Sequence, residues 1–290
     1  MRILLRHRNG LIRKSAKGLL APYRISCELS ASADRSTNLP SLLANSFPKS
    51  GTHLLDQVVM GLGNTRDFGR FIASAGSSFN YGLRTEQWCV DKISRITPNE
   101  IVRGHIFYSP AIENALVSNR CISLFIYRDP REVARSLVNY LQKMNRFHRL
   151  RAYFKGLDPE AALLLAINGI PSCENIYFPS ISERFRNYQG WLASEAVYCT
   201  KFEDVAGENQ EQELRKIIRF YLHRSGSGEQ TEDILKRMRG GLQPAKSHTF
   251  SGIQQQTWRD AFTPACIKAF KEQDHGLLTE LGYEFSEDWS

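Results

Sequence analysis

A segment that passes from an apolar strand through a tight loop directly into a helix lies at residues 41–62 and constrains the fold most. Residues 41–46 read SLLANS, a short and mostly apolar stretch. After the loop FPKSGT at 47–52, apolar side chains recur with helical spacing at positions 54, 55, 58, 59 and 62. A strand joined so closely to a helix is the unit from which α/β domains are built, with helices packed on a parallel sheet.

Three further apolar stretches have the length of strands and alternate with helical patterns. Residues 100–107 and 196–201 are short strand candidates, and residues 121–127 read CISLFIY, an unbroken apolar run. Such a run is typical of a strand buried on both faces of a parallel sheet. Helices are expected at 131–140, 210–223, 230–239 and 264–281. The alternation predicts an α/β fold with a central, mostly parallel sheet flanked by helices.

The remaining segments suggest an extension, a main domain and an insertion. Residues 27–40 are rich in small polar side chains and end in proline, so residues 1–40 are interpreted as a basic N-terminal extension with a linker. Residues 41–290 form the α/β domain. Within it, residues 63–98 look loop-rich. Residues 142–180 look irregular and contain three prolines, and a helix is expected to follow through Trp191. We expect residues 142–190 to form a lid or acceptor-binding insertion.

Positive charge is concentrated in the first 26 residues. The chain has 38 basic and 30 acidic residues, a formal net charge of +8. Residues 1–26 hold seven of the basic residues and no acidic residue, so the rest of the chain has 31 basic residues against 30 acidic ones. A nearly neutral body argues against a nucleic-acid partner. The tail has three interpretations: a solvated extension, a surface for an anionic partner or membrane, or an organelle-targeting peptide.

Apolar length and cysteine spacing exclude other classes of protein. The longest apolar run, at 161–167, is far shorter than the roughly 20 residues of a membrane-spanning helix, so no integral membrane association is expected. The cysteines contain no CxxC pair, which argues against a zinc ribbon or a thioredoxin-type motif. Unpaired thiols are typical of a reducing compartment, and we expect a cytoplasmic protein.

The loop between the first strand and its helix has the chemistry of an anion-binding site. A glycine turn at a helix N-terminus presents backbone N–H groups to one point, and such a point binds phosphate-like groups. Lys49 adds a positive charge, and Ser50 and Thr52 add hydroxyl donors. The nucleotide-binding pattern GxxxxGKS or GxxxxGKT is absent because this lysine precedes Gly51. An ordinary glycine turn is the alternative interpretation.

Two further candidates follow the neighbouring strands. Arg128 follows the long apolar strand, at the sheet edge where open α/β folds bind ligands. Ser136 is eight residues further on, about two helical turns, so the two side chains can serve one phosphate. His105, near the end of the preceding strand candidate, could accept a proton as a general base. The alternatives are an Arg128–Asp129 surface pair with an ordinary helical serine, and a structural histidine.

Taken in chain order, these pieces resemble the sulfotransferase superfamily. FPKSGT at 47–52 is similar to its 5′-phosphosulfate-binding loop, and IYRDPREVARSLVNY at 126–140 is similar to its 3′-phosphate-binding segment. The other similar segments are RGH at 103–105, FED at 202–204, Trp258 with FTP at 262–264, and LGYE at 281–284. The resemblance covers about residues 41–285. It is to soluble, bacterial-type members similar to cytosolic sulfotransferases, and it implies a single P-loop-kinase-like domain.

The resemblance implies a sulfotransferase that uses 3′-phosphoadenosine-5′-phosphosulfate and releases adenosine-3′,5′-bisphosphate after in-line displacement. The acceptor atom would be a hydroxyl oxygen or an amine or amide nitrogen of a small soluble molecule. A natural product is one class of acceptor that the resemblance allows. No metal ion is implied, and a homodimer is left open.

The resemblance also assigns roles to residues. His105 would be the general base, with His53 or Glu113 as substitutes, and Lys49 would neutralise charge on the bridging oxygen. The implied donor-binding residues are Lys49, Ser50, Gly51, Thr52, His53, Arg128, Ser136, Phe202, Ser251 and Gly252. The aromatic candidates for an acceptor pocket are Phe68, Phe79, Tyr81, Trp88, Phe107, Tyr108, Tyr153 and Phe154.

The chain departs from the family pattern in three places. His53 and Leu54 replace the Thr-Trp that commonly follows the loop, where the tryptophan helps to hold adenine, and Phe202 replaces a tyrosine. The family's Arg-Lys-Gly before the C-terminal tryptophan is reduced to Ser251-Gly252. Residues that could compensate are Lys246, Ser247 and Gln254. Two alternatives therefore stay open: a catalytically degenerate nucleotide-binding module of the same fold, and a P-loop kinase.

Overall fold

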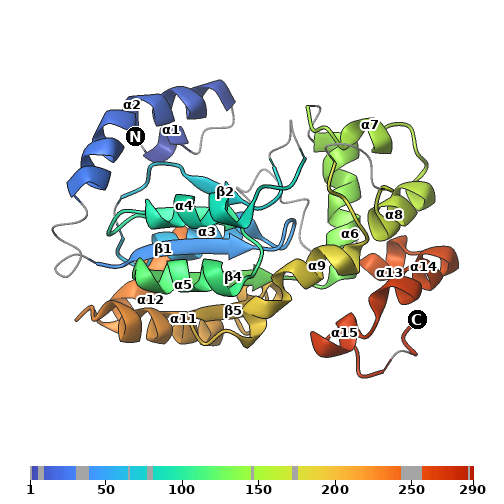
Figure 1. Ribbon diagram of the computed structural model, residues 1–290. Coiled ribbons are helices and arrows are strands. Elements are labelled where there is room, and N and C mark those ends of the chain that lie inside the picture. Colours follow the sequence, from blue (N-terminus) through green and yellow to red (C-terminus); the bar gives the residue numbers. More distant parts are fainter. Residues whose placement is uncertain are drawn as a thin grey trace.

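The sheet at the centre of the domain is parallel throughout (Figure 1). The computed structural model describes residues 2–5, 10–30, 39–64, 66–76, 81–144, 147–171, 176–242, 257–286 and 288–290. The sheet has the strand order β2-β3-β1-β4-β5. The strands are β1 (Ser41–Ser46), β2 (Phe71–Ala73), β3 (Ile101–His105), β4 (Cys121–Tyr127) and β5 (Val197–Lys201). The predicted α/β fold with a mostly parallel sheet is confirmed.

The register of the central strands brings their carboxyl ends to one edge of the sheet. Ser46, the last residue of β1, pairs with Ile126 of β4, and Asn45 pairs with Gly104 of β3. The loop after β1, the end of β3 and the residues after β4 therefore lie side by side. This is the edge at which open α/β sheets bind their ligands.

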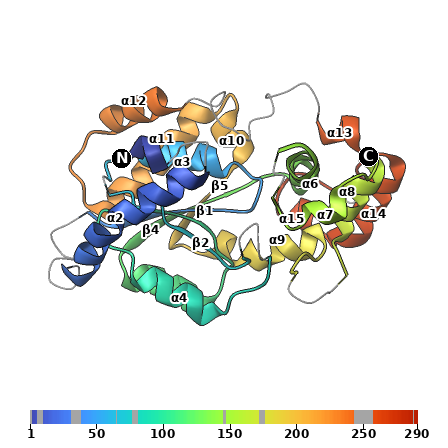
Figure 2. The same cartoon turned by 90° about the horizontal axis from the view of Figure 1, so that it is seen from above.

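Helices cover both faces of the sheet, and Figure 2 shows α4 on one side and α11 and α12 on the other. The helices that share a hydrophobic cluster with Leu42 and Ala44 are α3 (Thr52–Met60), α11 (Gln210–Ser225) and α12 (Thr231–Gly241). Those that pack in a second cluster with Leu43 are α4 (Glu86–Ser94) and α5 (Pro110–Ser118). Side chains of β1 alternate between the two clusters because successive residues of a strand point to opposite faces.

A second group of helices lies beyond the carboxyl ends of the strands (Figure 2). Its members are α6 (Pro130–Asn139), α7 (Arg151–Phe154), α8 (Pro159–Asn168), α9 (Ile181–Gln189), α13 (Trp258–Ala261), α14 (Pro264–Asp274) and α15 (Leu277–Glu280). Shorter helical turns stand between neighbouring elements. A π-helical turn Tyr140–Met144 follows α6, a 3-10 turn Gly190–Ala193 leads from α9 back to β5, and α10 (Phe202–Ala206) follows β5.

The segment 142–180, which we expected to be irregular, contains the helices α7 and α8, and the helix expected to follow it through Trp191 is present as α9 and the 3-10 turn. Asp158 caps α8 by accepting a hydrogen bond from the Ala161 N–H at 2.9 Å, and Pro159 occupies the first helical position. Ser180 caps α9 in the same way. The expectation failed because Pro159 stands at the first position of α8, where a missing N–H costs nothing. The role of this segment as a lid stays a prediction.

The N-terminal extension is helical and packs on the body of the protein. After α1 (Arg2–Leu5), α2 (Gly10–Ser30) includes the first residues of the expected linker. Ala16 and Cys27 are buried, and the Tyr23 ring meets Phe68 edge-on with centroids 5.8 Å apart. None of the helices in the described residues combines the length and hydropathy that a membrane span requires.

Two other expectations were wrong in detail. Residues 63–98 contain β2 and α4, although the sequence there looks loop-rich. The helix expected at 264–281 is interrupted, because His275 and Gly276 adopt left-handed φ angles of 47° and 80° between α14 and α15.

Candidate active site

The loop between β1 and α3 depends on two left-handed residues. Gly51 has φ 96° and Lys49 has φ 72°, which is unusual for a residue with a side chain. A Cβ added at Gly51 would lie 2.5 Å from Cδ2 of Phe202. Glycine is therefore required at this position both by backbone conformation and by the close approach of the aromatic ring. Strained residues such as Lys49 cluster at functional sites.

Lys49 presents a positive charge with no acidic partner. Its Nζ lies 3.7 Å from the centre of the Tyr140 ring, and within the described residues it forms no ion pair. Burial, and then the positive charge of Arg128, lower the pKa of Lys49 to about 8. A half-buried ammonium group held against a ring face is available to an incoming anion.

His105 is oriented by the last residue of β1. Its Nδ1 lies 2.7 Å from the carbonyl oxygen of Ser46 and 3.1 Å from the Ser46 hydroxyl. Because a carbonyl oxygen only accepts, we assign the proton to Nδ1, which leaves Nε2 with a free lone pair. Burial is the main cause that lowers the pKa of His105 to about 4, with smaller contributions from Lys49 and His53. At neutral pH the imidazole is therefore uncharged and can accept a proton.

The Ser46 hydroxyl also connects the histidine to the loop. Ser46 Oγ lies 2.8 Å from Oγ1 of Thr52, the first residue of α3. The hydroxyl of Ser50 is buried and makes no hydrogen bond to any described group. His53 is exposed on the first turn of α3, close enough to affect the His105 pKa.

Arg128 lies against the same loop through Phe202. Its guanidinium carbon is 4.4 Å from the centre of the Phe202 ring, and one terminal nitrogen donates to Glu132 Oε2 at 3.3 Å. The Arg128 Nε–H is buried and has no hydrogen-bond partner among the described residues. Ser136 is half-buried two turns along α6. The structure thus brings four predicted donor-site residues together: Lys49, Gly51, Arg128 and Phe202.

Other predicted residues lie elsewhere or outside the described residues. The Arg128–Asp129 surface pair is wrong as an alternative, because Asp129 pairs with Arg131 at 2.7 Å. The Glu113 carboxylate accepts hydrogen bonds from the hydroxyls of Tyr108 and Ser194. The predicted sites that fall outside the described residues are Ser251 and Gly252, with Lys246, Ser247 and Gln254.

Sequence reasoning missed the contacts that hold the C-terminal segment beside Arg128. The buried Arg131 forms ion pairs with Asp129 and with Glu284 at 2.5 Å, and its guanidinium lies between the rings of Trp258 and Trp289. The resemblance had pointed to Trp258 and to the LGYE segment that contains Glu284, but had given neither a role. Their role is to anchor the C-terminal segment to the start of α6.

Glu132 joins this anchor to Arg128. One of its carboxylate oxygens accepts the Trp258 backbone N–H at 2.6 Å, and the other accepts from Arg128 and from Arg135 at 3.0 Å. A carboxylate shared in this way fixes the position of Arg128 relative to the C-terminal segment.

A small aromatic cavity of about 40 Å³ lies beside Lys49. It contains two of the aromatic residues predicted for an acceptor pocket, Tyr81 and Phe107, together with Tyr177 and Tyr188. Two others, Phe68 and Trp88, line a separate cleft beside α2. Phe154 is buried in the core, Tyr108 packs on Trp191, Tyr153 is exposed, and Phe79 lies outside the described residues.

Comparison with known proteins identifies the family. The family model of the sulfotransferase domain matches residues 39–281, most of the chain. The chain belongs to the sulfotransferase family. The predicted superfamily and enzyme class are confirmed, and the P-loop-kinase alternative is wrong. No protein with a curated description matches this sulfotransferase significantly.

Solved structures of sulfotransferases share the fold. Mouse sulfotransferase SULT7A1, in a complex with PAP (adenosine-3′,5′-bisphosphate), is 17% identical with a TM-score of 0.57, over 84% of this chain and 87% of that one. Retinol dehydratase, in a complex with androsterone and the inactive cofactor PAP, is 13% identical with a TM-score of 0.51, over 88% and 86% of the two chains. At this identity the likeness shows the fold alone.

Proposed function

We propose that this sulfotransferase transfers a sulfuryl group from 3′-phosphoadenosine-5′-phosphosulfate to a hydroxyl or nitrogen of a small-molecule acceptor. The observation that carries the proposal is the convergence of Lys49, His105 and Arg128 at the carboxyl edge of β1, β3 and β4. The two similar solved structures are both complexes with PAP, which supports the choice of donor.

The residues present fit a donor with phosphate groups at both ends. Among the residues that the structure describes, Lys49 has no ion pair and the buried Ser50 hydroxyl has no hydrogen-bond partner. These residues, with Thr52, would hold the 5′-phosphosulfate. At the other end, the guanidinium of Arg128 would bind the 3′-phosphate together with Ser136. Its Nε lies 3.8 Å from Glu203 Oε1 and makes no hydrogen bond within the described residues. Roles for His53, Ser251 and Gly252 in donor binding stay predictions.

The side chains divide the chemical work between a base and a cation. When bound, the donor supplies a sulfuryl group on a phosphate leaving group. His105 takes the proton from the acceptor at Nε2, because Nδ1 is occupied by Ser46. Lys49 stabilises the negative charge that develops on the bridging oxygen as the sulfur–oxygen bond breaks.

We propose a small organic molecule as the acceptor, and a natural product is one such class. The cavity of about 40 Å³ beside Lys49 is too small to enclose it, so the acceptor would bind elsewhere at this edge of the sheet. We also propose a cytoplasmic location, because the described cysteines are free thiols, the form that a reducing compartment maintains. A homodimer stays a prediction.

Binding of adenosine-3′,5′-bisphosphate tests the donor assignment. We expect a dissociation constant in the micromolar range or below by calorimetry, with ADP at least about tenfold weaker, or ~1.4 kcal/mol. The preference should arise because Arg128 and Ser136 have a 3′-phosphate to bind in only one of the two ligands. Equal affinity, or no binding of either ligand, would indicate a degenerate module or a different nucleotide.

Replacement of Arg128 with alanine should weaken adenosine-3′,5′-bisphosphate binding at least about tenfold, because a hydrogen bond to a charged group contributes roughly 1.5–3 kcal/mol. The affinity for ADP should hardly change, since ADP has no 3′-phosphate. Arg135→Ala is the matched control, because Arg135 also binds Glu132 but lies seven residues, about two helical turns, beyond Arg128. An equal loss of affinity for both nucleotides in Arg128→Ala would contradict the 3′-phosphate role.

A further inference from the structure

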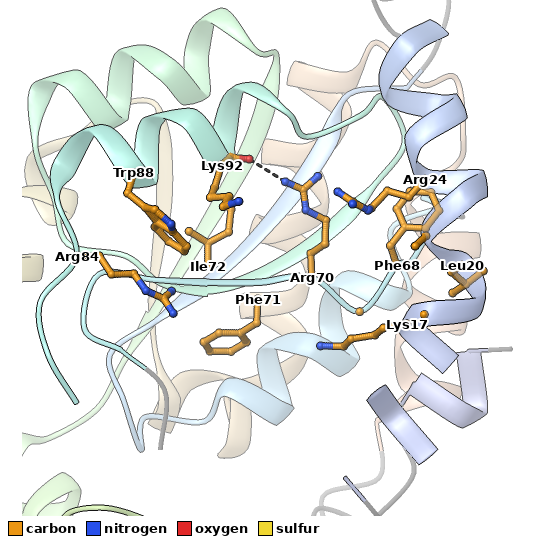
Figure 3. Close-up of a pocket in the computed structure, with 13 residues that line it drawn as sticks. Lys17, Leu20, Arg24, Phe68, Arg70, Phe71, Ile72, Arg84, Trp88 and Lys92 are labelled. Atoms are coloured by element: carbon orange, nitrogen blue, oxygen red, sulfur yellow. Dashed lines mark hydrogen bonds between the residues drawn. The ribbon is translucent and has the colours of Figure 1, made fainter. Parts of the chain in front are cut away.

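A cleft of about 420 Å³ lies at the free edge of the sheet, between α2, the edge strand β2 and α4 (Figure 3). Its lining combines positive side chains with aromatic rings and contains no acidic residue. The positively charged residues are Lys17, Arg24, Arg70, Arg84 and Lys92, and the aromatic rings include that of Trp88. A cleft of this size accommodates a drug-sized organic molecule.

Two of the five cations are neutralised locally. Arg24 pairs with Glu28 at 2.5 Å, and Arg70 pairs with Glu100 at 3.3 Å while donating to the Lys92 and Arg95 carbonyls. Arg70 also lies 3.6 Å from Glu28 of α2, so it holds α2 and α4 to the start of the edge strand, while the Arg24–Glu28 pair lies within α2. A structural role therefore accounts for both arginines.

The other three cations have no acidic partner. Lys17, Arg84 and Lys92 form no ion pair with any described residue. Arg84 donates to the Ala73 carbonyl at 3.2 Å and stacks 4.0 Å from the centre of the Trp88 ring, so it is positioned without being neutralised. The Lys92 ammonium lies 5.4 Å from the same ring.

Lys17 is placed over the cleft by its contact with Gly69. Gly69 has a left-handed φ of 66°, which favours glycine, and a Cβ added there would lie 2.9 Å from Cε of Lys17, so the lysine stem passes directly over this residue. Burial, followed by the charges of Arg103 and Arg13, lowers the pKa of Lys17 against an opposing effect of Asp67. In Figure 3, Lys17 and Arg84 extend toward Phe71 from opposite sides.

Phe71 connects this cleft to the reaction centre. Its ring meets the His105 ring edge-on with centroids 4.9 Å apart, and 45% of the residue is exposed. Phe71 therefore lines the cleft on one side and contacts, on the other, the histidine to which we assign proton abstraction.

We propose that the cleft binds the anionic end of the acceptor, so that this sulfotransferase acts on an organic acid whose hydroxyl or amine reaches His105 across Phe71. The proposal rests on the proposed function and specifies its substrate class. Lys17 and Arg84 bind the carboxylate or sulfate group, and Trp88 and Phe71 pack against the carbon skeleton. An acceptor without charge gains nothing from the three unpaired cations.

The test compares two acceptor probes that differ in one charge. Binding of 2-naphthol and of 6-hydroxy-2-naphthoate to the full chain is measured by calorimetry, with and without adenosine-3′,5′-bisphosphate. We expect the naphthoate to bind at least about tenfold more tightly, the effect of one charge-assisted hydrogen bond. Lys17→Glu should remove this preference, and Arg84→Gln should reduce it, without changing the affinity for 2-naphthol.

Lys14→Glu is the control, because Lys14 is exposed on the same helix and does not line the cleft. Thermal unfolding of each variant shows whether it is folded. Equal binding of the two probes by the wild type, or an equal loss of preference in Lys14→Glu, would overturn the proposal. Binding of adenosine-3′,5′-bisphosphate is a separate readout: its absence would refute the proposed donor, whereas its presence with equal probe binding would refute only the anionic acceptor.

Discussion

Replacement of Lys49 with alanine is expected to lower kcat at least about 100-fold, while the dissociation constant for adenosine-3′,5′-bisphosphate changes much less. The ammonium group sits in the loop that follows β1, and no acidic side chain in the described part of the chain pairs with it. One preorganised group of this kind typically stabilises a transition state by ~3–4 kcal/mol. The loss should appear in kcat because charge accumulates on the bridging oxygen only as its bond to sulfur breaks.

Single-turnover measurements with saturating donor would isolate this effect from product release. Lys143→Ala is the matched control, since Lys143 is an exposed lysine in the turn that carries Tyr140, the ring under Lys49. The control should keep wild-type turnover. If kcat of Lys49→Ala stayed within about tenfold of the wild-type value, Lys49 would not be the group that stabilises the transition state.

The Lys49 pKa of about 8 also fixes the sign of the pH dependence. Only the protonated lysine is a cation, so kcat/KM should fall as the pH rises through about 8. A bound anionic donor favours the charged form and raises this pKa, so the fall in kcat should occur at higher pH. Lys49→Arg should abolish the alkaline fall in both parameters, because arginine stays protonated throughout this range.

The buried strands could be predicted from the sequence because each is a short apolar run. The expected ranges 41–46 and 121–127 coincide with β1 and β4, whose side chains are buried on both faces. The edge strand β2 has only three residues, and Phe71 is 45% exposed, so no periodic pattern marks it. Its pairing with β3 is a property of the folded sheet and not of the local sequence.

The candidate site could be anticipated because parallel strands end at one edge. Lys49, His105 and Arg128 each follow or end a strand, so their meeting depends only on sheet topology. The anchor between Arg131 and Glu284 joins residues 153 positions apart. Neither charge has a feature in the local sequence that indicates its partner, so the contact required the structure.

The position of the basic N-terminal tail could not be predicted from the sequence either. Its charge is plain in the sequence, but the side from which Lys17 and Arg24 meet the edge strand depends on how α2 packs. Seven positive residues in 26 suggested an extended surface feature, whereas Ala16 and Cys27 are buried against the body. The packing turns part of an unassigned tail into one wall of a cleft.

Replacement of His105 with alanine should also lower kcat at least about 100-fold, within the range of roughly 10²–10⁴ that a general base contributes. The binding of adenosine-3′,5′-bisphosphate should be unchanged, because His105 is assigned to the acceptor and not to the donor. In the wild type, activity should stay constant from neutral pH down to about 5 and fall only as the pH drops through about 4, where the imidazole becomes protonated. A histidine with its ordinary pKa of about 6.5 would lose activity two units higher.

Imidazole added to His105→Ala separates a missing base from a damaged fold, since a free base can restore turnover only in an intact site. We expect partial recovery that follows the titration of the added imidazole, with a pKa well above that of the buried side chain. His53→Ala is the comparison, because this histidine is exposed on α3 near the same centre. It should retain most of the turnover. If His53→Ala instead lost 100-fold and His105→Ala did not, the base would be His53, and the bond from His105 to the Ser46 carbonyl would serve only to hold β3 against β1.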